Sequence, residues 1–217
     1  MPCGTRTIVS LLLALATCGT LSADDGRWSV RVDGNWVEPD GHPLDTEDGD
    51  GYTLTVSSSG DVGLGLSAEY RFSRTVGVSF GFLYSEPEIT VKLDVDQGGS
   101  DTATDGLGFL PIIVGLPIHL TSKRSVDFQV APLLSYVHYG DLAYTLGGES
   151  GVFDTSGDLA VGLEVGIDIG FGESPWSLYL GARYLRTEVE VIERGTGDRS
   201  SADFDPFFGV MGGRYRF

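Results

Sequence analysis

The chain has 217 residues, of which 41% are hydrophobic, 11% are aromatic and 32 are glycine, and its formal charge is −17. This length predicts one domain or at most two small ones. The aromatic content excludes a disordered acidic chain, the acidic balance argues against nucleic acid as a partner, and no stretch reaches the ~20 apolar residues of a membrane helix.

The N-terminal segment has the pattern of a secretory signal peptide. Arg6 precedes a short apolar run, and Leu21-Ser22-Ala23 offers a small-residue cleavage site. These three features together typify a signal peptide. We therefore expect residues 1–23 to be removed and residues 24–217 to form one mature domain. Both cysteines of the chain lie in the removed part, so the mature chain has no thiol for a disulfide or a metal site.

Eight segments of the mature chain alternate with a period of two. In each segment every second residue is apolar and none of these positions is charged, which is typical of β-strands. The positions between them hold small residues such as Gly65 and Gly81, and charged residues such as Asp33 and Arg183. The segments cover residues 28–36, 62–72, 76–84, 112–120, 126–136, 159–171, 176–184 and 207–217.

The size of the two sets of side chains decides which face points inward. The lumen of an eight-stranded barrel is just wide enough for side chains to fill, so the numerous bulky apolar residues do not fit there. The small and charged set fits the lumen, and the bulky set suits lipid. We predict an all-β fold, an eight-stranded antiparallel up-and-down transmembrane β-barrel, because only a closed barrel satisfies strand backbones in lipid. The alternative is a soluble barrel with its apolar set inside.

Loop lengths predict the orientation of this barrel. The connections after the second, fourth and sixth segments are short, and the others are long and polar. Outer-membrane barrels have short periplasmic turns and long external loops, so we expect both chain ends in the periplasm. Aromatic residues, which favour membrane interfaces, fall in two girdles. Trp36, Tyr84, Tyr136 and Tyr184 form the outer girdle, and the periplasmic girdle comprises Trp28, Tyr70, Phe72, Phe128, Phe171, Trp176, Tyr215 and Phe217.

Sequence motifs at both ends of the mature chain resemble known outer-membrane proteins. The ending Gly212-Gly213-Arg214-Tyr215-Arg216-Phe217 resembles the terminal-strand signal read by the insertion machinery, with Tyr215 and Phe217 as its aromatic positions. The chain further resembles the OmpW family, although its first loop is unusually acidic and Phe207 stands where that family more often has Trp. The segments similar to that family are Trp28-Ser29-Val30-Arg31-Val32, Val37-Glu38-Pro39, Leu110-Pro111 and Asp205-Pro206-Phe207.

The OmpW resemblance carries expectations about location and activity. It implies a monomeric eight-stranded barrel in the outer membrane of a Gram-negative bacterium, reached through the periplasm and surrounded by lipid and lipopolysaccharide. It also implies a narrow channel for small hydrophobic molecules. No cofactor is implied.

Inward positions divide by height into a charged and an apolar set. The lower and middle lumen is predicted to hold a charge network of mixed sign, because paired charges are the tolerable way to bury ions. The outer lumen is predicted to form an apolar cup, which binds a hydrophobic molecule that then leaves sideways into the membrane. The alternative is that both layers only pack a narrow barrel. The network comprises Arg31, Asp33, Glu69, Arg71, Asp127, Glu164, Asp168, Arg183, Arg214 and Arg216, and the cup comprises Val37, Leu83, Ile113, Leu133, Val137, Leu185, Phe208 and Val210.

Other patterns leave two further functions open. The first two external loops are rich in Asp and Glu, which favours a solvated acidic surface, with divalent bridging to lipopolysaccharide phosphates as an alternative. The histidines have no metal-ligand spacing. Ser135 and His138 near the outer rim are the nearest candidates for a lipid-A deacylase, although we predict no enzyme. A structural or surface-adhesive barrel that uses its acidic loops is the main alternative to a channel.

Overall fold

The structure is a computed structural model that describes residues 27–39, 45–49, 52–95, 99–121, 125–146, 149–193 and 199–217. Every regular element in these ranges is a β-strand. Among the same residues no helix is long and apolar enough to cross a membrane. The predicted signal peptide, residues 1–23, lies outside the described residues.

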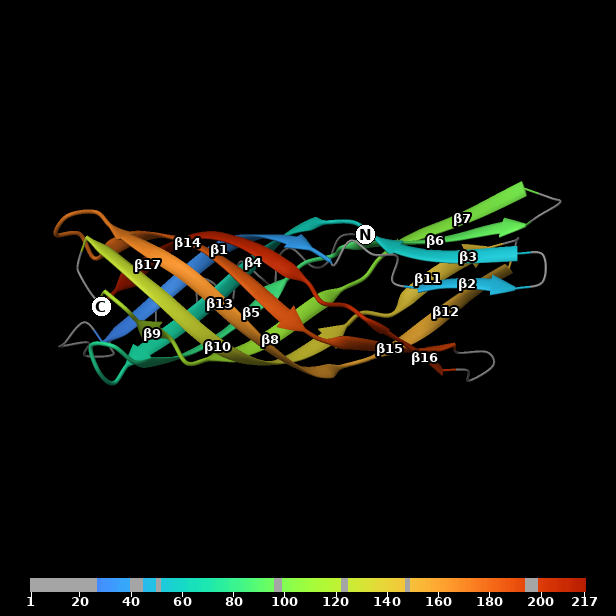
Figure 1. The fold of residues 1–217 in the computed structure, drawn as a ribbon. Helices are drawn as coiled ribbons and strands as arrows, with labels where there is room; N and C mark the ends of the chain where they lie inside the picture. Colours follow the sequence, from blue (N-terminus) through green and yellow to red (C-terminus); the bar gives the residue numbers. More distant parts are fainter. Residues whose placement is uncertain are drawn as a thin grey trace, which may run out of the picture.

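A closed antiparallel barrel forms one half of the molecule (Figure 1). Neighbouring strands pair in the order β13-β14-β17-β1-β4-β5-β8-β10, and β10 pairs back with β13 to close the ring. The short β9 continues β8 after Leu116 and Pro117 and also pairs with β10. Counting β8 and β9 as one strand, the barrel has eight strands. The strands are β1 (Trp28–Glu38), β4 (Asp61–Arg71), β5 (Gly77–Tyr84), β8 (Phe109–Gly115), β9 (Ile118–His119), β10 (Val126–Tyr139), β13 (Asp158–Gly170), β14 (Trp176–Arg186) and β17 (Phe207–Arg216).

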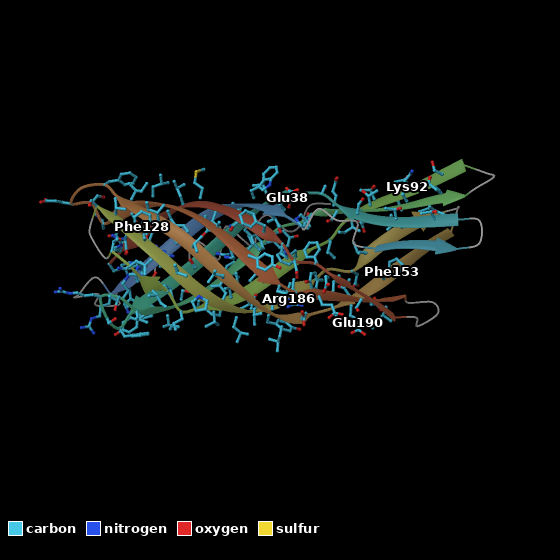
Figure 2. All side chains as sticks on the ribbon, in the orientation of Figure 1. Glu38, Lys92, Phe128, Phe153, Arg186 and Glu190 are labelled. Atoms are coloured by element: carbon cyan, nitrogen blue, oxygen red, sulfur yellow. The ribbon has the colours of Figure 1, made fainter. Side chains whose placement is uncertain are left out.

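Exposure confirms the predicted division between the two faces of the strands. The bulky set points outward: Leu64 is 68% exposed, Val161 is 58% exposed and Met211 is 63% exposed. Figure 2 shows side chains projecting all around the outside of the barrel, and the exposed Phe128 lies near the end where the short turns are. A face of this kind is stable only against lipid, because large contiguous apolar surface is rare in soluble monomers.

The long external loops fold as two sheets of hairpins that extend the barrel (Figure 1). One sheet has the order β2-β3-β6-β7 and the other has the order β11-β12-β15-β16. The sheets meet where the backbone N–H of Ala143 donates to the Asp105 carboxylate at 2.8 Å. The strands are β2 (Asp45–Gly49), β3 (Tyr52–Ser58), β6 (Glu88–Val95), β7 (Gly99–Gly106), β11 (Leu142–Leu146), β12 (Glu149–Ser156), β15 (Glu188–Glu193) and β16 (Arg199–Asp203).

The outer aromatic girdle marks the boundary between barrel and extension. Trp36, Tyr84, Tyr136 and Tyr184 are all exposed on the outward face, as predicted. The Trp36 indole donates to Glu38 at 3.0 Å and the Tyr184 hydroxyl donates to Asp205 at 2.9 Å. The rings of Trp36 and Tyr184 therefore face lipid with their apolar part, while their polar atoms bind carboxylates on the side nearer water.

Candidate functional site

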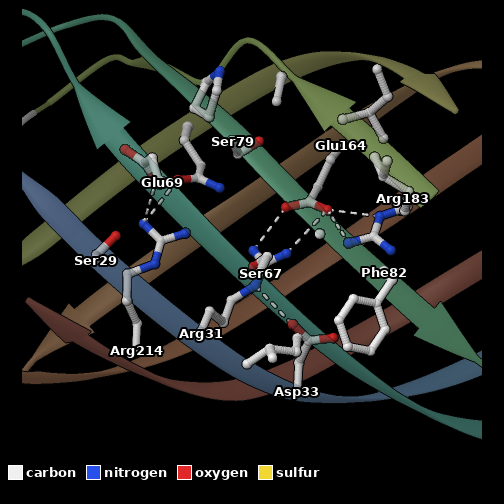
Figure 3. Close-up of a pocket in the computed structure, with 17 residues that line it drawn as sticks. Ser29, Arg31, Asp33, Ser67, Glu69, Ser79, Phe82, Glu164, Arg183 and Arg214 are labelled. Carbon is white, nitrogen blue, oxygen red and sulfur yellow. Dashed lines mark hydrogen bonds and ion pairs between the residues drawn. The ribbon is translucent and has the colours of Figure 1, made fainter. Parts of the chain in front are cut away.

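The middle of the lumen is crossed by an ion cluster centred on Glu164 of β13, drawn in Figure 3. Arg31 of β1 donates to one Glu164 oxygen at 2.8 Å, and Arg183 of β14 lies 2.6 Å from the other. Arg31 also contacts Asp33 at 2.8 Å, and the Asn35 amide donates to Asp33 at 2.5 Å. These residues are at most 5% exposed, so every charge depends on the opposite charge beside it.

A second ion cluster lies nearer the short turns and is built around His119. Its two ring nitrogens lie 2.8 Å from Glu69 and 2.9 Å from Asp127. Ionised carboxylates only accept hydrogen bonds, so when both carboxylates are ionised both ring nitrogens donate and the imidazole is the protonated cation. Arg71 contacts the same two carboxylates at 2.9 and 3.0 Å.

Arg214 of β17 joins this second cluster to Asp168. Its guanidinium lies 2.5 Å from Asp168 and 3.3 Å from Glu69. Arg216 approaches Asp168 at 3.6 Å. The two clusters together contain all ten residues predicted for the charge network. These residues come from six of the eight barrel strands.

Tyr179 of β14 links the two clusters across the lumen. Its hydroxyl donates to Glu164 at 2.6 Å and accepts from the Gln129 amide at 3.1 Å. The guanidiniums of Arg31 and Arg214 lie 4.1 and 5.1 Å from the centroid of its ring. A cation over an aromatic face is attracted by the ring quadrupole, so Tyr179 is held by both its edge and its face.

The space for Tyr179 is provided by glycine on the next strand. A Cβ placed on Gly166 would collide with the Tyr179 hydroxyl and ring, which the two arginines prevent from moving aside. Gly166→Ala should therefore lower the free energy of unfolding by about 1 to 3 kcal/mol, as overpacking does. The midpoint of urea unfolding in detergent measures this. Gly209→Ala is the matched control, because its nearest neighbour is 3.7 Å away, and an equal loss in both variants would contradict the collision.

The charged network leaves little free space in the lumen at its own level. The cavity that remains between Arg31, Glu164 and the surrounding side chains holds about 30 Å³ (Figure 3). That volume has room for about one or two water molecules. The charged side chains therefore fill most of this level of the lumen, and we call this layer the floor.

Above this floor the lumen is apolar and tightly packed. The predicted cup residues Val37, Leu83, Ile113, Leu133, Val137, Leu185, Phe208 and Val210 are all buried inside the barrel, none more than 7% exposed. They pack with an aromatic cluster, defined here as Phe109, Tyr139, Phe204 and Phe208. The centroid of the Phe109 ring lies 5.6 to 6.1 Å from the centroids of the other three rings.

This packing differs from the open cup expected from the sequence. The aromatic cluster and Leu107 occupy the space where a ligand was predicted to sit. The reason is that the inward-facing set continues beyond the predicted strands, with Phe109 at the start of β8, Tyr139 at the end of β10 and Phe204 before β17, and all three are buried. In this conformation the outer lumen is closed by its own side chains.

Several of the site residues were not predicted for their roles. Tyr179 and His119 hold inward positions in the alternating pattern, and their polar atoms beside inward charges were the available signal. Phe204 lies outside any alternating segment, so no periodic signal marked it. Ser135 and His138 were the nearest candidates for a deacylase in the sequence. Ser135 faces the lumen and donates to the Ile112 carbonyl, whereas His138 lies exposed on the opposite face of β10.

The acidic loops were considered for metal binding. Among the described residues no group of three or more His, Cys, Asp or Glu side chains is arranged to hold a metal ion. Asp61 instead accepts a hydrogen bond from the Glu86 backbone N–H at 2.6 Å, and Asp105 accepts the Ala143 bond across the two sheets. These carboxylates satisfy backbone donors of the extension.

Comparison with protein families agrees with this architecture. The family model described as "outer membrane protein beta-barrel domain" matches residues 8–217. The chain belongs to this family. The family match, together with outer-membrane barrels among the similar solved structures, locates the protein in the outer membrane. No curated protein sequence matches this chain.

Solved structures with the same fold come from several outer-membrane proteins. OprG from Pseudomonas aeruginosa superposes with a TM-score of 0.66 at 18% identity, over 88% of this chain and 95% of OprG. AlkL in lipid bilayers gives 0.57 at 22% identity, over 91% of this chain and 93% of AlkL. Neisserial surface protein A gives 0.55 at 13% identity, over 89% of this chain and 98% of that protein. These likenesses establish the fold.

Proposed function

We propose that this protein is an OmpW-type barrel that takes up small hydrophobic molecules from the external side and releases them into the outer membrane. The observation that carries the proposal is the division of the lumen into an outer half whose buried side chains are uncharged and a charged floor. An apolar molecule gains by entering the outer half, because apolar contacts replace water. It cannot cross the floor without breaking buried ion pairs, which is strongly unfavourable.

Passage requires the aromatic cluster to move. The cluster is held mainly by ring contacts, together with one hydrogen bond of 2.9 Å between the hydroxyls of Tyr139 and Thr187. Ring contacts are weakly directional, so an apolar ligand replaces them at low cost. A ligand cannot replace buried ion pairs at a similarly low cost. We therefore infer that the cluster acts as a gate and that the floor stays fixed.

A sideways exit is supported by the weak pairing of β8 with its neighbours. Pro111, Pro117 and Pro132 have no backbone N–H, and each stands where a neighbouring strand offers a carbonyl. Gly77 donates to Pro117 and Leu116 donates to Pro132, but neither proline can return the bond. Pro111 lies at cup height beside Leu83, between the paired residues Phe82–Ile112 and Ser85–Phe109. We infer that the barrel wall opens there.

Direct binding of a fluorescent medium-chain hydrocarbon to the refolded barrel tests this function. We expect saturable binding that an unlabelled alkane displaces. The double variant Leu133→Asp and Phe208→Asp should abolish binding, because it places two charges in the apolar half. Heat-modifiable gel mobility reports folding of both proteins. Unchanged binding in the folded double variant would disprove an apolar site in the lumen.

A surface-adhesive barrel is the second candidate, and the folded extension favours it. Two four-stranded sheets stand beyond the outer girdle, which gives the external face a defined shape rather than loose loops (Figure 1). If the verified folded barrel binds no hydrocarbon probe, the aromatic cluster is packing alone and this second function is preferred.

A further inference from the structure

A deep groove interrupts the lipid-facing surface of the barrel. It runs over the neighbouring strands β17, β1, β4 and β5 and has a volume of about 410 Å³. Its base is made by the half-buried Val30, Leu66 and Ala68, which are less exposed than the residues around them. Exposed residues stand on either side of it, namely Val32, Phe80, Phe82 and Phe217.

The groove lies in the half of the membrane next to the periplasm. Val30 pairs with Ala68, and two residues closer to the turn end Trp28 pairs with Tyr70. The rings of Trp28 and Tyr70 lie 4.9 Å apart and belong to the periplasmic girdle. Such rings sit at the level of the lipid head groups, so the groove starts just below that level and runs toward the membrane centre.

A positive charge stands beyond the girdle at the same end. Arg27 is exposed and directly precedes Trp28. The carbonyl oxygen of Arg27 accepts a hydrogen bond of 2.8 Å from the backbone N–H of Arg71, which holds the Arg27 backbone beside β4. Along the chain, the cation Arg27 is therefore followed by the girdle ring of Trp28 and then by Val30 of the groove. A phospholipid has the matching order of phosphate, glycerol and acyl chain.

We propose that this groove binds one phospholipid of the periplasmic leaflet, with an acyl chain between the groove walls and the phosphate beside Arg27. The bound lipid has a higher affinity than ordinary boundary lipid because it makes more van der Waals contacts with the protein. Lipid tails are as apolar as these side chains, so the hydrophobic effect does not distinguish the site from bulk lipid. A chain seated in a groove touches protein atoms on several sides, which adds dispersion attraction. The site is independent of transport through the lumen.

Native mass spectrometry of the barrel in detergent with added phosphatidylglycerol tests this site. We expect one phospholipid to be retained by the unsubstituted protein. Ala68→Phe fills the groove floor and should lower the retained fraction at least tenfold. Ala182→Phe is the matched control, since Ala182 is an outward-facing, half-buried alanine on β14 away from the groove, and it should retain the lipid. Heat-modifiable mobility confirms that each variant is folded.

The head-group contact has its own readout. Arg27→Gln should weaken retention of phosphatidylglycerol but leave retention of diacylglycerol with the same chains unchanged. A second measurement needs no substitution in the groove. Quenching of Trp28 fluorescence by phosphatidylglycerol brominated on its acyl chain should saturate at one lipid per barrel, and Trp28→Phe should remove the saturating component.

Three results would overturn the site. The first is an unsubstituted barrel that retains no phospholipid. The second is equal loss of lipid in Ala68→Phe and Ala182→Phe, which would mean ordinary boundary lipid. The third is quenching that rises in proportion to lipid without saturation. Because the quenching experiment uses the unsubstituted chain, misfolding of a variant leaves the proposal open to disproof.

Discussion

Glu164→Gln should lower the free energy of unfolding of the refolded barrel by about 3 to 5 kcal/mol, because it removes one partner from a buried ion cluster. Arg31 and Arg183 both contact this carboxylate, and each is 5% exposed or less. The amide keeps the shape of the side chain but carries no charge, so Arg183 would lose its carboxylate partner and Arg31 would keep only Asp33. Urea titration in detergent, followed by tryptophan fluorescence and gel mobility, measures the loss.

Two further variants separate charge from packing in this result. Glu188→Gln lies at an exposed position of β15 and should change stability by less than about 0.5 kcal/mol. The quadruple variant Glu164→Leu, Arg31→Met, Arg183→Met and Asp33→Asn removes every charge of this cluster and should recover most of the stability lost in Glu164→Gln. A loss in Glu164→Gln no larger than that in Glu188→Gln would show that the floor does not depend on these ion pairs.

Phe109→Ala should destabilise the barrel and at the same time strengthen binding of a hydrocarbon probe. Phe109 is fully buried and its ring contacts Tyr139, Phe204 and Phe208, so its removal should cost about 3 to 5 kcal/mol of folding free energy. The same change leaves an apolar space above the floor. If the aromatic cluster is a gate, the probe no longer has to displace this ring, and its affinity should rise about tenfold, equivalent to about 1.4 kcal/mol.

The two readouts of Phe109→Ala distinguish the gate from simple packing. Stability is measured by urea titration and affinity by probe fluorescence on the same preparation. Phe128→Ala removes a ring of the same size from the lipid-facing side of β10, where it is 47% exposed, and should leave probe affinity unchanged. A destabilised Phe109→Ala barrel with unchanged probe affinity would mean that the cluster only packs the lumen.

Much of the barrel follows from local pattern. Side chains alternate between the two faces of a strand, so the apolar positions and the small or charged positions already define the eight barrel strands and their two faces. The predicted segment 126–136 became β10 and the predicted segment 176–184 became β14, each extended by a few residues toward the outside. The predicted charges met in the lumen because strand direction and length fix their height.

Which charged residues pair within the floor could be determined only from the three-dimensional structure. Arg31 and Glu164 are 133 residues apart, and nothing in either strand selects the other until the ring closes between β17 and β1 and between β10 and β13. Tyr179 is a further case, because its place between two arginines depends on Gly166 of the neighbouring strand. Pairings of this kind depend on strand register and on side-chain length, which a one-dimensional pattern does not contain.

The sequence by itself determined the strand pattern, the membrane-facing surface and the separation of charge from apolar residues along the lumen. The reason is that alternation, residue size and loop length act locally and survive without knowledge of the fold. Only the tertiary structure decided that the outer lumen is filled, that the loops form two sheets and that a groove crosses the outward face of four neighbouring strands. Those features arise where Phe204, Ala68 and other residues from distant segments meet, and packing between segments has no local signature.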